Sequence, residues 1–130
     1  MRHLTEYKRF LIESTSTLEE IKPNRYVYHT SNPIFRDKIA REGLTPQGRS
    51  ESWLTTTAID GKVIFAVNSN KDEYIWDSTY DDDLYKIDTE LLDNKWYQDP
   101  NFADGIHMIT YEPIPKEALE LLHKGTGNSY

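Results

Sequence analysis

The sequence contains no cysteine among its 130 residues. This absence excludes disulfide bonds, thiolate catalysis and zinc sites built on cysteine. The chain also lacks an apolar run of the roughly 18 residues that a membrane-spanning helix needs. Residues 1–6 become charged where a signal peptide would be apolar. We therefore expect a cytoplasmic protein that does not contact a membrane.

The sequence has no basic excess. It carries 15 Lys and Arg residues against 22 Asp and Glu residues, which gives a formal net charge of −7. Proteins that hold a phosphate backbone usually present a basic face. The balance therefore argues against non-specific nucleic-acid binding. A small pocket with a few arginines is still compatible with this net charge, because the net charge of the chain does not describe the charge inside one pocket.

Metal-binding patterns are also missing, so we predict no metal site. The histidines at positions 3, 107 and 123 are too dispersed to suggest a zinc site. Asp77 and the run Asp81 to Asp83 lack the spacing of a calcium-binding loop, which favours a solvated acidic loop.

The length suits a single domain that is large enough to bury a core. Apolar residues at spacings of three and four near the start predict an N-terminal helical flank over residues 1–22, with a further short turn around Leu18 and Ile21. We assign residues 23–124 to the main domain and residues 125–130 to a flexible tail.

Residues 25–44 give the clearest local prediction. Residues 25–30 favour a strand in which Val27 and His29 share one face. Ser31 or Asn32 can cap a following helix, and Pro33 suits its first position. Gly43 predicts the end of that helix.

The remaining pattern predicts four more short strands and a closing helix. We expect strands at residues 53–57, 62–67, 84–88 and 105–111, a loop at 96–104, and a helix from Pro115 to His123. This order predicts an α+β fold: a small mixed or antiparallel sheet with flanking helices.

Five short motifs, taken in order, resemble the ADP-ribosyltransferase superfamily. They are Tyr28-His29-Thr30-Ser31, Glu42-Gly43-Leu44-Thr45-Pro46, Trp53-Leu54-Thr55, Leu84 to Asp88, and Glu112-Pro113-Ile114-Pro115. Within the superfamily, the pattern is similar to compact bacterial and phage members, to DNA-modifying toxins and to tRNA 2′-phosphotransferases. The resemblance covers about residues 25 to 122 and implies a split sheet that binds NAD, as a substrate, in a cleft.

The resemblance also implies roles for individual residues at the nicotinamide end of NAD. His29 would hold the nicotinamide ribose, and the backbone of Thr30 would pair with the nicotinamide amide. Trp53 would stack on the planar nicotinamide, because aromatic faces suit such rings. Both residues also have a purely structural interpretation. His29 would then be a strand-end histidine that is hydrogen-bonded to the backbone, and Trp53 would pack in the core or at its rim.

A carboxylate and three arginines complete the implied site. Glu112 would stabilise the positive charge that develops on the ribose as nicotinamide leaves. Its structural alternative is a solvated carboxylate before a proline turn. Guanidinium groups suit phosphate oxygens, so the arginines that could reach the pyrophosphate are Arg36, Arg41 and Arg49.

Three functions remain open from the sequence. The first is an NAD-dependent ADP-ribosyltransferase-like enzyme with an unknown acceptor, for which protein is one candidate. The second is a catalytically inactive domain of the same fold that binds or inhibits a protein partner through the acidic, aromatic stretch from Tyr74 to Tyr85. The third is an RNA 2′-phosphotransferase, which the net charge disfavours.

Overall fold

A six-stranded antiparallel sheet and one short α-helix make up the regular structure of the described residues. The computed structural model describes residues 18–47, 62–68, 81–100, 102 and 104–127. The strands follow the order β4-β5-β2-β1-β3-β6 across the sheet. The predicted strand at 53–57 and most of the predicted N-terminal helical flank lie outside the described residues.

The elements have the following bounds. The strands are β1 (Tyr26–Ser31), β2 (Ile64–Val67), β3 (Asp83–Asp88), β4 (Tyr97–Gln98), β5 (His107–Thr110) and β6 (Leu119–His123). The helix is α2 (Arg36–Glu42), and the 3-10 turns are η1 (Pro33–Phe35), η2 (Thr89–Leu91) and η3 (Lys116–Ala118). The expectation of a small sheet with flanking helices is confirmed in part. The sheet is antiparallel throughout, and the described residues contain one short α-helix beside it.

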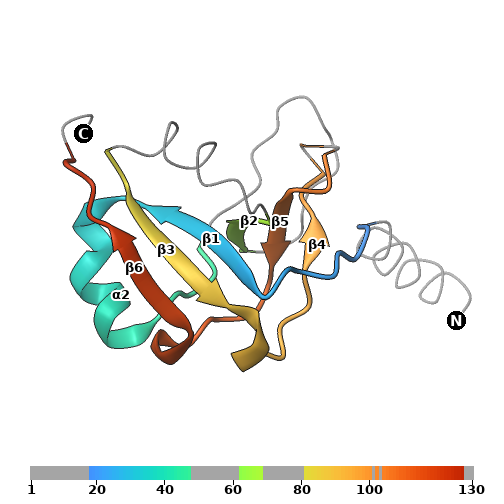
Figure 1. Cartoon of the computed structure of the whole chain (residues 1–130), viewed down its shortest axis with the longest axis horizontal. Helices are drawn as coiled ribbons and strands as arrows, with labels where there is room; N and C mark the ends of the chain where they lie inside the picture. Colours follow the sequence, from blue (N-terminus) through green and yellow to red (C-terminus); the bar gives the residue numbers. More distant parts are fainter. Residues whose placement is uncertain (1–17, 48–61, 69–80, 101, 103, 128–130) are drawn as a thin grey trace, which may run out of the picture.

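Strand β1 pairs very differently with its two neighbours. It pairs with β3 along its whole length, from Tyr26 opposite Asp88 to Ser31 opposite Asp83. Its register with β2 has a single pair, Tyr28 opposite Val67. Figure 1 shows β1, β3 and β6 running together, with β2, β5 and β4 forming the other half of the sheet. The sheet is therefore least continuous between β1 and β2.

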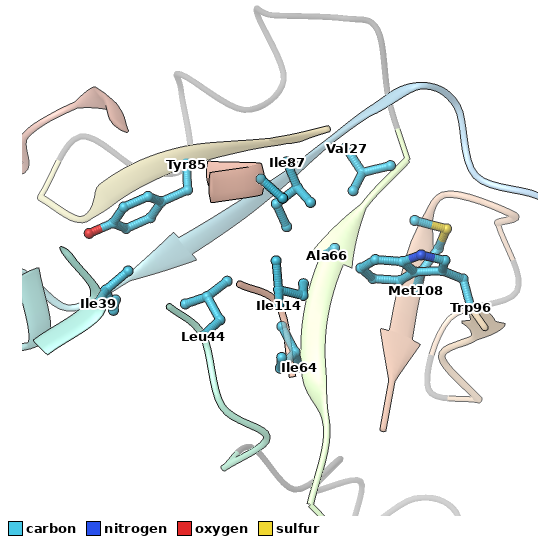
Figure 2. Close-up of a cluster of buried hydrophobic side chains, with 11 residues drawn as sticks. Val27, Ile39, Leu44, Ile64, Ala66, Tyr85, Ile87, Trp96, Met108 and Ile114 are labelled. Atoms are coloured by element: carbon cyan, nitrogen blue, oxygen red, sulfur yellow. The ribbon is translucent and has the colours of Figure 1, made fainter. Parts of the chain in front are cut away.

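The hydrophobic core lies on one face of this sheet (Figure 2). Val27 of β1 and Ile87 of β3 are opposite each other, and both are fully buried. Because side chains alternate along a strand, His29 and Tyr85 follow on the same face. Ile39 of α2 covers one end of the core, and Trp96 packs at the other end.

Helix α2 follows the local signals in its sequence. The Asn32 side chain accepts a hydrogen bond from the Ile34 N–H at 3.0 Å, and Pro33 opens the turn η1. Gly43 ends the helix at a φ of 77°, with its N–H bonded to the Ile39 carbonyl. The predicted helix is therefore confirmed, with Asn32 capping the turn η1 that leads into it and Gly43 at its C-terminal end.

The predicted helix from Pro115 to His123 is wrong. The structure has the single turn η3 and then strand β6, which pairs with β3. Leu119 and Leu121 pack on the core, whereas Glu120 and Leu122 are exposed, so the segment follows a period of two. A short apolar segment can fit both the helical period and the strand period. Here its pairing with the edge of β3 favours the strand.

Two other segments differ from the prediction because they pair with distant parts of the chain. The expected loop at 96–104 contains β4, which pairs with β5. Residues 18–22 run beside β4 instead of forming a helical turn. The Ile21 N–H donates to the Trp96 carbonyl, and the Gln98 N–H donates to the Glu19 carbonyl.

The chain after β6 returns to the start of β3. The Gly125 N–H donates to a carboxylate oxygen of Asp83 at 2.8 Å. The Thr126 hydroxyl and the Gly127 N–H bond to Asp81 at 2.5 and 3.1 Å. The first three residues of the expected flexible tail are thus held to the sheet. No helix among the described residues is long and apolar enough to cross a membrane.

Candidate functional site

His29 lies where β1 and β2 separate. Its Nδ1 atom is 2.5 Å from the carbonyl oxygen of Phe65 on β2. A carbonyl oxygen can only accept, so Nδ1 carries the hydrogen. Burial lowers the pKa of His29, and this outweighs the opposing effect of the Phe65 carbonyl. The ring is therefore neutral at pH 7, and its Nε2 atom is a hydrogen-bond acceptor.

A cavity of about 260 Å³ opens beside this histidine. We call it the His29 cavity. Its walls come from the end of β1, from η1 and α2, from the segment after α2, and from β2. The lining residues are His29, Thr30, Ser31, Asn32, Phe35, Lys38, Ile39, Gly43, Leu44, Thr45, Gln47, Val63, Ile64 and Phe65.

Two of the residues predicted for the NAD site lie in this cavity. His29 and Thr30 both line it, as expected for neighbours at the end of a strand. Trp53 and Arg49 lie outside the described residues. The site can therefore be traced only on the β1, α2 and β2 sides.

Arg36 and Arg41 do not line the His29 cavity. Arg36 forms a two-pronged ion pair with Asp83, with N–O distances of 2.8 and 2.7 Å. Arg41 is exposed, and its Nε donates to the carbonyl of Asp37 at 3.3 Å, one turn earlier in α2. Neither guanidinium is therefore part of the described lining of the His29 cavity.

Glu112 lies just beyond β5, and its side chain is exposed. Its carbonyl oxygen accepts a hydrogen bond from the Asn94 side chain at 2.9 Å. Two residues later, Ile114 exchanges two backbone hydrogen bonds of 2.9 Å with Leu44, which lines the cavity. The Glu112 backbone is thus close in sequence to the cavity wall, but its side chain is not part of the lining.

The sequence reasoning missed Phe35 and Lys38, which both line the cavity. They are three residues apart, so they project on one side of α2, next to the inward-facing Ile39. Arg36 and Ala40, four residues apart, project on the other side. The spacing of residues along the helix was the sequence signal that could have identified Phe35 and Lys38. The same spacing places Lys38 and the predicted Arg36 on different sides of α2.

The described part of the lining supplies hydrogen-bonding groups, apolar surface and one cation. The neutral His29 can accept from a hydroxyl, and the Gln47 side chain donates to the Thr45 hydroxyl at 3.2 Å. Phe35 and Phe65 offer aromatic surface, and Lys38 can meet an anion. Within the described residues no group of three or more acidic or histidine side chains could hold a metal ion.

No protein-family model matches the sequence, and no curated protein matches it.

Proposed function

We propose that the domain is ADP-ribosyltransferase-like, binds NAD in the His29 cavity and transfers ADP-ribose to an acceptor. The main support is the position of His29. A neutral histidine, fixed by the Phe65 carbonyl, lines a cavity beside the short pairing between β1 and β2. The ordered motifs described above assign the same histidine to the nicotinamide ribose.

The size and lining of the cavity suit the nicotinamide riboside half of NAD. The cavity has about 260 Å³, slightly below the roughly 300–1,000 Å³ that is typical of small-molecule sites, so we place only this half of NAD in it. Phe35 and Phe65 provide apolar surface for a planar ring, and His29 Nε2 can accept from a ribose hydroxyl. Lys38 would then meet a phosphate at the mouth of the cavity.

The proposed reaction breaks the bond between ribose C1′ and the nicotinamide nitrogen. Nicotinamide leaves with the electron pair, positive charge develops on the ribose, and the acceptor forms the new bond and loses a proton. A fixed carboxylate near C1′ would lower the barrier electrostatically. Glu112 remains the proposed carboxylate, although its side chain does not line the cavity.

We expect His29→Ala and Lys38→Ala each to weaken NAD binding about tenfold, because each removes one polar contact with the ligand. Arg41→Ala is the matched control on α2, and it should leave the dissociation constant unchanged. Isothermal titration calorimetry with NAD measures all three variants. The absence of saturable binding of NAD to the folded wild-type protein at millimolar concentration would overturn the proposal.

A second candidate is a binding domain without transferase activity. It is favoured by the absence of any Asp or Glu side chain from the described lining of the cavity. Most of the acidic, aromatic stretch proposed for a protein partner lies outside the described residues.

Release of nicotinamide from NAD separates the two candidates. An enzyme should release nicotinamide, and Glu112→Gln should slow the release at least about 100-fold while NAD still binds. A wild-type protein that binds NAD but releases no nicotinamide, with or without candidate acceptors, would support the binding domain. Asp93→Asn, at another exposed carboxylate, is the control.

A further inference from the structure

A second cavity lies on the opposite side of α2 from the His29 cavity. It has a volume of about 280 Å³ and lies between α2, β3, η3 and β6. We call it the Tyr85 cavity. Its lining residues are Arg36, Ile39, Ala40, Tyr85, Lys116, Leu119 and Leu121. Ile39 lines both cavities, so α2 separates them.

Tyr85 contributes its side-chain hydroxyl group to the lining of the second cavity. The residue is only 4 % exposed, and its hydroxyl has no hydrogen-bond partner in the described part of the chain. Figure 2 shows the hydroxyl at the end of the core, pointing past Ile39. Burial raises the pKa of Tyr85, and Asp83 adds to this effect, so the group remains a donor. A ligand in the cavity could therefore accept a hydrogen bond from this hydroxyl.

Two cationic side chains lie on the walls around this hydroxyl. Lys116 of η3 is exposed and makes no ion pair within the described ranges. Arg36 uses Nε and Nη2 to hold Asp83, so its positive charge is largely balanced there. Lys116 is therefore the main uncompensated charge at this cavity.

The remainder of the lining is aliphatic. Ile39 and Ala40 of α2 lie across from Leu119 and Leu121 of β6. A suitable occupant must therefore combine a short apolar body with an anionic group that accepts hydrogen bonds. The volume is below the typical range of about 300–1,000 Å³, which limits the occupant to a small molecule.

We propose that the Tyr85 cavity is a second binding site, specific for a small monocarboxylate with a short apolar chain. The carboxylate accepts a hydrogen bond from the Tyr85 hydroxyl and pairs with Lys116. The apolar chain packs on Ile39, Leu119 and Leu121. The site does not require NAD, so it can be tested independently of the proposed activity.

The test uses hexanoate and its uncharged amide, hexanamide, as probes. Each probe is titrated into the isotope-labelled full chain, and backbone amide chemical shifts are followed by NMR. We expect hexanoate to produce saturable shifts at Ala40, Tyr85 and Leu121, and hexanamide to bind about tenfold more weakly. Equal binding of the two probes, or no saturable shifts at these residues, would overturn the proposal.

Two variants test the named contacts. Tyr85→Phe removes only the hydroxyl group, and Lys116→Gln removes only the charge, so both preserve the shape of the cavity. Each should weaken hexanoate binding about fivefold to tenfold. Lys95→Gln, at an exposed lysine outside the lining, is the control and should bind like the wild type. If both cavity variants also bind like the wild type, the assignment is wrong.

Discussion

Replacement of Asp83 by alanine is expected to lower the free energy of unfolding by about 2–4 kcal/mol at neutral pH. The Asp83 side chain is fully buried at the start of β3. It accepts two hydrogen bonds from Arg36 and one from the Gly125 N–H. One carboxylate thus connects α2, β3 and the chain after β6. Its loss leaves the Gly125 N–H without this acceptor and releases the start of α2.

Urea denaturation followed by circular dichroism measures this effect. Asp93→Ala is the matched control, because that carboxylate is exposed, and a substitution at such a position changes stability by at most about 0.5 kcal/mol. Equal denaturation midpoints for the two variants would show that the Asp83 ion pair does not stabilise the fold.

The contribution of Asp83 should also depend on pH in a defined direction. Burial alone would raise the pKa of Asp83. The hydrogen bonds from Arg36 and from the Gly125 N–H lower it by more, so the pKa of Asp83 in the folded protein lies below the usual 3.8. A pKa that is lower in the folded protein stabilises the fold above the unfolded pKa of about 3.9. This stabilisation is lost as the pH falls through the folded value.

The stability difference between wild type and Asp83→Ala should therefore be constant from pH 7 to pH 5 and should shrink below pH 4. Urea titrations at several pH values measure it. A difference that grows on acidification would contradict this direction.

The parts of the fold that the sequence predicted correctly depend on neighbouring residues. Alternation along β1 was enough to place Val27 and His29 on one face, since a strand repeats every two residues. Asn32 and Gly43 mark the ends of a helix for reasons of local hydrogen bonding and backbone geometry. These signals act within a few residues and do not depend on the rest of the chain.

The parts that the sequence reasoning missed depend on contacts between distant residues. Strand β6 forms because β3 offers a free edge, and β4 forms because β5 does. Arg36 is directed away from the His29 cavity because it pairs with Asp83, 47 positions away. Local pattern shows that residues 36 and 38 project on different sides of α2. Only the arrangement of the sheet shows which side meets His29.

The Gly43→Ala substitution should have a comparably large effect, since a methyl group cannot fit at this position. Gly43 has a φ of 77°, which other residues rarely adopt. A Cβ atom there would lie 2.3 Å from the Ile114 carbonyl oxygen and 2.9 Å from the Lys116 nitrogen. Both are backbone atoms, so no side-chain rotation relieves the contact. We expect a loss of about 3 kcal/mol in the free energy of unfolding.

Gly105→Ala is the matched control for this prediction. Gly105 has a similar φ of 69°, but a Cβ atom there would meet no atom within 4 Å. The substitution should cost only about 1–2 kcal/mol, for the backbone conformation alone. The difference between the two variants therefore measures the close contact of the chain after α2 with residues 114–116. Gly43 also lines the His29 cavity, so Gly43→Ala should weaken the NAD binding that we propose there, whereas Gly105→Ala should not. Equal losses of stability in the two variants would show that this close contact does not constrain the fold.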